Sequence, residues 1–139
     1  MKIDHICFAV KRLEEGVEYW KETFDYCEMT KPVINTRQKV KVIFLEKENS
    51  LLVKLIEPLE NNKSLKNFVE FGGGFHHICF WCDNLVTTMN VLKKKDVKLL
   101  VPPQPGEAFN NNNIAFYLAK FKTTFELIDT RDKAEKINR

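Results

Sequence analysis

The pattern of apolar and polar positions repeats along the chain at a constant offset of 72 residues, the spacing between His5 and His77. Three apolar segments recur at this offset: residues 4–8 as 76–80, 42–45 as 114–117, and 54–57 as 126–129. A repeat that holds its register without a gap predicts two copies of one supersecondary unit, related by a pseudo-twofold axis. The same offset makes Lys54 equivalent to Glu126.

The first copy is expected to fold as a strand, a helix and three further strands. Residues 3–10 are apolar around His5 and predict a strand, and residues 11–26 carry apolar side chains at helical spacing among Glu and Lys. The remaining strands are predicted at residues 28–33, 38–46 and 51–57.

A connector separates the two copies. Residues 59–71 predict a short helix, and the three glycines at 72–74 predict a flexible joint. The second copy is expected to repeat the order of the first, with Asp83 or Asn84 capping its helix. Its elements are predicted as a strand at 75–82, a helix to about residue 95, a strand at 97–101, a loop at 102–113, and a hairpin of 113–118 with 123–129. The charged segment 130–139 is expected to be a frayed helix or disordered.

These elements predict an α+β fold in which each unit reads βαβββ. The chain is expected to form one domain over residues 1–139. Its parts are module one at 2–58, the connector at 59–73, module two at 74–130 and the charged tail at 131–139. Two such modules side by side make a curved eight-stranded sheet, whose concave face forms a cup for a small ligand.

Composition narrows the range of partners and compartments. The 139 residues carry a net charge of +3 spread along the chain without a basic arm, so no nucleic-acid partner is expected. No apolar run reaches the ~20 residues of a membrane span, and the N-terminus enters a strand directly, so neither a membrane nor a secretory signal is expected. Four cysteines in such a chain fit free thiols in a reducing cytoplasm. The expected partner is a small-molecule substrate.

Strand alternation places the candidate site on one face of the sheet. His5 shares a face with Cys7, and His77 with Cys79, because side chains two apart on a strand point the same way. If the copies meet across an axis, His5, His77 and Glu126 converge, and two imidazoles with a carboxylate can bind Zn, Ni, Co or Mn. The alternative is that each is a hydrogen-bonded core residue or a solvated strand residue.

Other residues of these strands receive structural interpretations. His76 precedes His77 and is expected to point to the opposite face, which excludes it as a ligand. Cys7 and Cys79 are interpreted as small apolar fillers beneath the cup. Residues 79–82 match a C-x-x-C spacing, but within a strand its two sulfurs project to opposite faces.

The strand motifs resemble those of the vicinal oxygen chelate superfamily, which includes glyoxalases and bleomycin-resistance proteins. The motifs are residues 4–6, 39–45, 55–58, 73–78 and 125–128. Within the superfamily the Gly-Gly-x-His-His-Ile stretch looks most like methylmalonyl-CoA epimerases, with glyoxalase I next. The resemblance covers about residues 2–129, and it implies paired βαβββ modules around one divalent metal.

The resemblance maps the family's four metal ligands onto His5, Lys54, His77 and Glu126. Lys54 departs from the family pattern, because a protonated ammonium has no lone pair and repels a divalent cation. We therefore expect an altered metal site with His5, His77 and Glu126 as ligands, and an ion pair between Lys54 and Glu126 in the metal-free protein.

Three functions fit these residues. In the first, a metal-dependent isomerase (epimerase-like) or lyase (glyoxalase I-like) acts through an enolate on an acyl thioester or related carbonyl compound, with Glu126 as ligand and base. In the second, Lys54 supplies the positive charge without a metal, and Glu126 pairs with it or acts as base. In the third, the cup binds and sequesters a small molecule without chemistry. The modules can pair within one chain or swap in a homodimer.

Overall fold

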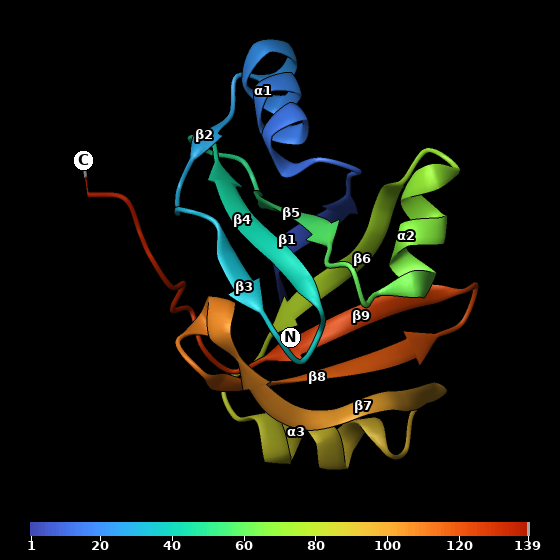
Figure 1. Ribbon diagram of the computed structural model, residues 1–139. Coiled ribbons are helices and arrows are strands. Elements are labelled where there is room, and N and C mark those ends of the chain that lie inside the picture. Colours follow the sequence, from blue (N-terminus) through green and yellow to red (C-terminus); the bar gives the residue numbers. More distant parts are fainter. Residues whose placement is uncertain (139) are drawn as a thin grey trace.

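The computed structural model describes residues 1–138, and nine strands within this range form one curved mixed sheet that does not close into a barrel (Figure 1). The strands are β1 (Lys2–Ala9), β2 (Cys27–Glu28), β3 (Val33–Asn35), β4 (Val40–Glu46), β5 (Leu52–Pro58), β6 (Gly74–Trp81), β7 (Val97–Gly106), β8 (Asn112–Ala119) and β9 (Thr123–Ile128). Their order across the sheet is β2-β4-β5-β1-β6-β9-β8-β7, and β3 also pairs with β4.

The two halves of the sheet repeat each other strand for strand. Cys7 on β1 lies opposite Lys54 on the parallel strand β5, and Cys79 on β6 lies opposite Glu126 on the parallel strand β9. Both pairs are related by the offset of 72 residues. β1 and β6 are antiparallel neighbours at the centre, where the halves join. The predicted pair of βαβββ units with Lys54 equivalent to Glu126 is confirmed.

The prediction of eight strands was wrong, because the second strand of the first unit is divided. Residues 28–33 were expected to form one strand, but β2 and β3 pair with different parts of β4 on either side of Pro32. Proline has no backbone N–H to donate to a ladder, so it interrupts pairing at this position.

The corresponding strand of the second unit is longer than predicted. Residues 102–106 were expected to be part of a loop, but β7 continues through them to Gly106 and pairs with β8. Because β7 is an edge strand, its prolines need no partner on the outer side, and two register shifts adjust the pairing around them.

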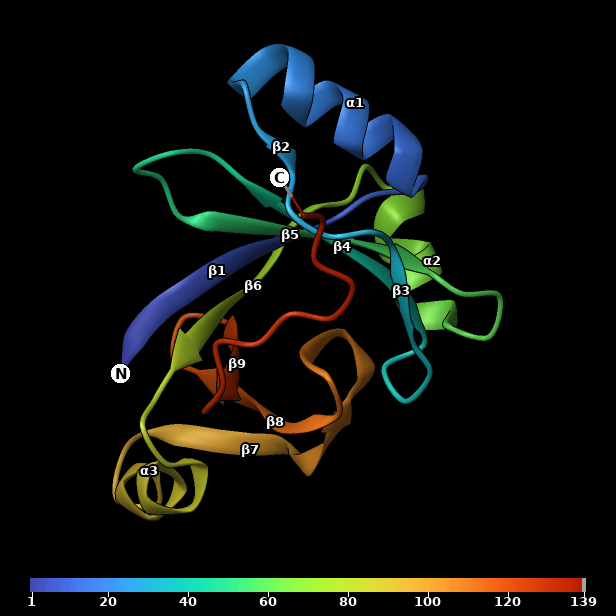
Figure 2. The same cartoon turned by 90° about the vertical axis from the view of Figure 1, so that its left-hand side faces the viewer.

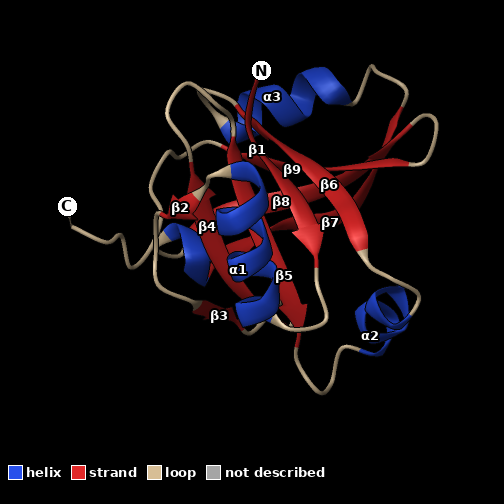
Figure 3. Ribbon diagram, turned by 90° about the horizontal axis from the view of Figure 1, so that it is seen from above, coloured by secondary structure: helices blue, strands red, loops and turns tan. Residues whose placement is uncertain are grey.

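Three helices accompany the sheet within the described residues: α1 (Leu13–Phe24), α2 (Lys63–Glu70) and α3 (Leu85–Leu92). α1 and α3 cover the outer sides of the two halves (Figure 2), and α2 stands beside the ends of β5 and β6 (Figure 3). Asn84 caps α3 by accepting a hydrogen bond from the Thr87 N–H, as predicted. None of these helices has the length and apolarity needed to cross a bilayer.

Apolar side chains form one inner cluster between the halves and one outer cluster beneath each of α1 and α3. On β4, Val42 and Phe44 face the inner cluster, whereas Ile43 and Leu45 pack in the outer cluster with Leu13 of α1. The second outer cluster lies beneath α3. This alternation leaves the inner face of β5 and β9 for the polar residues of the candidate site.

Residues 130–138 form no helix and pack against the rest of the chain, contrary to the predicted frayed helix or disordered tail, and residue 139 of that prediction lies outside the described residues. The Ala134 N–H donates to the Ala108 carbonyl at 2.8 Å, and the Ile137 N–H donates to the Met29 carbonyl at 2.9 Å. Thr30 and Lys136 form an isolated bridge. From the end of β9 the segment runs back toward β2, across the space between the two halves (Figure 2).

Candidate active site

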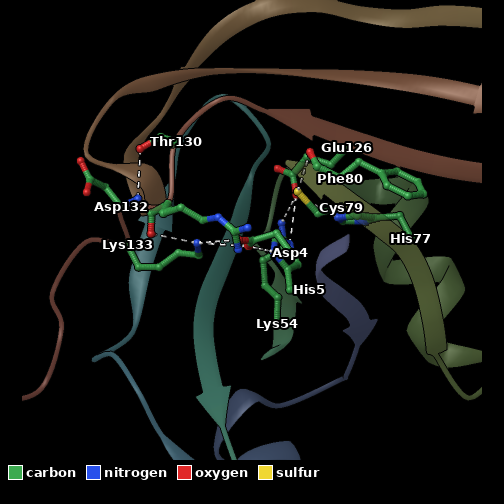
Figure 4. Close-up of polar contacts among 11 residues, drawn as sticks. Asp4, His5, Lys54, His77, Cys79, Phe80, Glu126, Thr130, Asp132 and Lys133 are labelled. Carbon is green, nitrogen blue, oxygen red and sulfur yellow. Dashed lines mark hydrogen bonds and ion pairs between the residues drawn. The ribbon is translucent and has the colours of Figure 1, made fainter. Parts of the chain in front are cut away.

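Four buried polar side chains meet at the centre of the inner face, one from each of β1, β5, β6 and β9. Lys54 Nζ lies 2.8 Å from Glu126 Oε1, and the Nε2 atoms of His5 and His77 each lie 3.2 Å from the same oxygen (Figure 4). All four residues are at most 3% exposed. The structure therefore brings together all the predicted site residues, and the predicted Lys54–Glu126 ion pair is confirmed.

Lys54 and Glu126 each stabilise the charged form of the other. Burial alone would raise the pKa of Glu126, but the Lys54 ammonium and the hydrogen bond from His77 hold it well below its ordinary value. Burial alone would lower the pKa of Lys54, and the neighbouring carboxylate outweighs this effect and raises it. Both groups are therefore charged at neutral pH, in a place where either charge alone would be costly.

His77 is neutral and donates to the carboxylate. Burial, followed by the charge of Lys54, lowers the pKa of His77 to about 3. Its Nε2–H donates to Glu126 Oε1 at 3.2 Å, so its Nδ1 carries the lone pair and accepts from His76 Nδ1 at 2.8 Å. Burial also lowers the pKa of His76, so this imidazole is neutral as well and keeps a lone pair on Nε2.

The prediction that His76 points to the opposite face was wrong. The register between β1 and β6 shifts between Cys7–His77 and Phe8–Phe75, which makes His76 the extra residue of a β-bulge. A bulge re-aims the side chain that strict alternation would place outside. His76 consequently contacts the ring of His77 and lines the central cavity.

A matching bulge lies at Asp4, the residue equivalent to His76 in the first unit. Here the register shifts between Ile3–Phe80 and His5–Cys79. The buried Asp4 carboxylate accepts a hydrogen bond from His5 Nδ1 at 2.7 Å. His5 therefore carries its proton on Nδ1, and the lone pair of its Nε2 points toward the centre of the site. This is the opposite tautomer to that of His77, which carries its proton on Nε2.

The site has metal-binding donor atoms, and Lys54 decides whether they can be used. Ligand atoms of His5, His77 and Glu126 lie within 4.8 Å of one another. Two of them, His5 Nε2 and Glu126 Oε2, are buried and have no hydrogen-bond partner within residues 1–138. However, the Lys54 ammonium contacts the carboxylate oxygen on which both imidazoles converge. With Lys54 in this position the residues do not fit a divalent cation, which the ammonium would repel.

A cavity of about 480 Å³ opens above these residues and receives side chains from both units. Its floor includes Lys54, Glu126 and His77, and its wall includes Arg37 and Gln38 from the β3–β4 turn. Both amide atoms of Gln38 are buried and have no hydrogen-bond partner among the described residues. The size and the few unsatisfied polar groups are those of a small-molecule site.

The turn that carries Gln38 is held from two sides. The Asn62 side-chain amide donates to the carbonyls of Gln38 and Lys39 at 3.2 and 3.1 Å. From the second unit, the Glu107 carboxylate accepts from the Thr36 N–H at 3.0 Å and from its hydroxyl at 2.7 Å. The backbone that carries the unpaired Gln38 amide is thus held by contacts from the connector and from the second unit.

All four cysteines are free thiols. Cys7 and Cys79 belong to the inner cluster, and Cys82 belongs to the outer cluster beneath α3. Burial raises the pKa of Cys7 to about 12, so its thiol stays protonated. The sulfurs of Cys79 and Cys82 lie on opposite faces, as strand alternation predicted.

Sequence reasoning missed four residues of the site and its surroundings: Asp4, Gln38, His76 and Lys133. One signal was available for two of them, because Asp4 and His76 are equivalent in the repeat and both precede a site histidine. No local pattern marks a bulge, an unpaired amide or a lysine that folds back from the C-terminal segment.

The sequence model described as the Glyoxalase/Bleomycin resistance protein/Dioxygenase superfamily matches residues 4–116 of this chain. Among curated proteins, methylmalonyl-CoA epimerase of Dictyostelium discoideum is 26% identical over 103 residues, 73% of this chain and 61% of that protein. The bovine epimerase is 28% identical over 71% of this chain and 57% of its own length. The chain thus matches about three fifths of the length of these relatives. YqjC, an uncharacterized protein of Bacillus subtilis, is 29% identical over 83% of this chain and 81% of its own length.

Solved structures show the same fold. Methylmalonyl-CoA epimerase from Mycobacterium tuberculosis superposes with a TM-score of 0.80 at 22% identity, covering 92% of this chain and 87% of that one. A hypothetical protein from Bacillus halodurans gives 0.81 at 23% identity, covering 97% and 98%. The epimerase of Streptomyces coelicolor, solved as a variant in complex with 2-nitronate-propionyl-CoA, gives 0.79 at 24% identity, covering 94% and 97%.

We expect Lys54→Met to lower the free energy of unfolding by about 3–5 kcal/mol, because it leaves the Glu126 carboxylate buried without its cation. Lys54→Met combined with Glu126→Met should recover most of this loss. Lys66→Met, which removes a solvent-exposed pair with Glu60, is the control and should change stability little. Guanidinium unfolding measures all three, and a Lys54→Met variant as stable as the parent would contradict the charge assignment.

Stability should also fall in mild acid because of His77. Its pKa is about 3 in the folded chain and 6.5 in the unfolded one, so below pH 6.5 only the unfolded chain takes up the proton. The free energy of unfolding should therefore decrease as pH falls from about 6.5 toward about 3, and His76, whose pKa is also lowered, adds to this slope. His77→Gln should flatten the decrease between about pH 6.5 and 5, above the range in which Glu126 titrates. Unfolding curves with unchanged slope would exclude a neutral buried His77.

Proposed function

The chain belongs to the glyoxalase/bleomycin resistance protein/dioxygenase superfamily, and from this premise we propose that it is an epimerase-type enzyme. Its substrate would be an acyl thioester or a related carbonyl compound with an acidic hydrogen next to the carbonyl group. The observation that carries the proposal is the charged Lys54–Glu126 pair at the floor of a cavity built by both units. The similarity to several methylmalonyl-CoA epimerases supports the same reaction type.

Lys54 would stabilise the negative charge of the reaction. When a proton leaves the carbon next to a carbonyl group, the electron pair of the C–H bond moves into the carbonyl and forms an enolate oxygen. The Lys54 ammonium lies in a buried site, where a fixed positive charge stabilises such an oxygen far better than it would in water. This is the role that a metal ion would have as a Lewis acid, and no step here needs one.

Glu126 would accept the proton through its unpartnered oxygen, Oε2. That oxygen is buried and makes no hydrogen bond to any residue that the structure describes, whereas Oε1 is held by Lys54 and His77. Inversion at carbon also needs a proton delivered to the opposite face of the enolate. His76 lines the same cavity as a neutral imidazole, so its Nε2 lone pair can take up a proton from solvent water and deliver it to that face, while Glu126 returns the abstracted proton to solvent.

Arg37 and Gln38 would hold the substrate. The described lining of the cavity carries Arg37 and Lys54 as cations and Glu126 as its one anion, so an anionic ligand is favoured. A ligand that reaches Gln38 would satisfy an amide whose donor and acceptor are both buried and unpaired. An acyl-CoA, which is anionic, meets both conditions, and one epimerase of this fold has been solved with methylmalonyl-CoA and NH4+.

A second function is supported by the low pKa of Glu126. A carboxylate that is so strongly stabilised in its charged form is a weak base, and the ion pair with Lys54 already satisfies one of its oxygens. The cup would then bind its small molecule without transforming it. The two proposals differ in one observable, which is exchange of the substrate's hydrogen with solvent.

We expect the protein to exchange the α-hydrogen of methylmalonyl-CoA, or of another α-branched acyl-CoA, for deuterium in heavy water. Glu126→Gln should lower the exchange rate about 10²-fold or more, because an amide cannot accept the proton. Glu60→Gln, on the surface, is the matched control and should exchange at the parent rate. Mass spectrometry follows the exchange, and calorimetry follows binding. Saturable binding with no exchange would support sequestration, and exchange that survives Glu126→Gln would remove Glu126 from the proposed role.

A further inference from the structure

Lys133 is a buried cation from the C-terminal segment, which follows the last of the nine strands. Its side chain is 1% exposed, although it lies between the exposed residues Asp132 and Glu135. Its Nζ lies 5.3 Å from the ring centre of Phe44 and 5.5 Å from that of Phe109. A lysine is rarely buried this deeply unless it is paired, so the contact that compensates it identifies its role.

The group that compensates the Lys133 charge is the carboxylate of Asp4, which contacts Nδ1 of His5. Lys133 Nζ lies 3.1 Å from Asp4 Oδ2 and 3.4 Å from Oδ1, and it also donates to the Arg131 carbonyl at 3.2 Å. Asp4 Oδ2 is the same oxygen that accepts from His5 Nδ1 at 2.7 Å. Figure 4 shows the Lys133 side chain reaching toward Asp4 on the side away from His77.

A second cation near Asp4 does not replace Lys133. Arg131 lies 3.4 Å from Asp4 Oδ1, but its side chain is 55% exposed and its guanidinium stacks on the ring of Trp81 at 4.4 Å. A solvated, more distant guanidinium compensates a buried carboxylate weakly. Lys133 is therefore the buried cation that holds the Asp4 carboxylate in place.

We infer that Lys133 is a positioning residue of the active site, which holds Asp4 as the acceptor for His5 Nδ1 and thereby keeps the His5 Nε2 lone pair directed at the centre. The C-terminal segment would then be a structural part of the site. This inference uses the proposed function only in treating His5 as a site residue. His76 takes the position of Asp4 in the second unit, and His77 there has the opposite tautomer.

The charges of the whole cluster agree with this role. From one end to the other the buried groups are Lys133, Asp4, His5, Glu126 and Lys54, in contact in that order. The cluster contains two ammonium groups and two carboxylates. Removal of Lys133 leaves the Asp4 carboxylate without its buried partner, so Asp4 no longer holds the His5 proton on Nδ1 and the proton can move to the other nitrogen, nearer Glu126.

The test is nitrogen NMR of the full-length protein labelled at histidine, which shows which ring nitrogen carries the proton. In the parent, His5 should be the Nδ1–H tautomer and His77 the Nε2–H tautomer. Lys133→Met should reduce the Nδ1–H signal of His5 and leave the tautomer of His77 unchanged. Lys133→Arg keeps the charge and should restore the His5 signal. Lys136→Met removes an exposed lysine of the same segment and should have no effect.

Two results would overturn the inference. A parent protein in which His5 carries its proton on Nε2, or on both nitrogens, excludes the role without any variant. An unchanged His5 tautomer in Lys133→Met, or in the milder Lys133→Gln if the first variant does not fold, reduces Lys133 to a packing residue. Since the readout needs no turnover, it stays valid even if the protein exchanges no acyl-CoA hydrogen and the proposed function fails.

Discussion

The buried ion pair between Lys54 and Glu126 is the interaction on which the site depends. It joins equivalent positions of the two units across the pseudo-twofold axis, at 2.8 Å and without contact with solvent. The strand pairs β1–β5 and β6–β9 bring the two groups to the same point, because both pairs have the same register. A buried charge without a partner is energetically unfavourable, so each of the two residues stabilises the charged form of the other.

The pair also changes what the geometry of the fold can do here. Two imidazoles and a carboxylate still converge within 4.8 Å, which is a donor set for a divalent metal. The Lys54 ammonium contacts that carboxylate and therefore competes with a divalent cation for the same position, and its positive charge would repel the cation. The centre of the site thus has a positive charge that belongs to the chain itself.

The internal repeat made most of the fold and the four central residues predictable from the sequence. An offset of 72 residues fixes which strands are equivalent, and period-two alternation then fixes which face His5, Lys54 and their counterparts occupy. The same alternation failed at Asp4 and His76, because a bulge adds one residue and re-aims its side chain. Lys133 could not be predicted at all, since its burial depends on contacts made by a segment with no periodic pattern.

We propose that Lys54 occupies the place of a metal ion. Calorimetric titration of the Lys54→Gln variant with Zn, Ni, Co and Mn tests this proposal. Replacing the ammonium by an amide oxygen restores a possible ligand beside His5, His77 and Glu126. We expect the variant to bind at least one of these metals about tenfold or more tightly than the parent, and we expect the added substitution His5→Gln to abolish this gain in affinity. Equal affinity in the parent and in Lys54→Gln would show that Lys54 does not obstruct metal binding at this site.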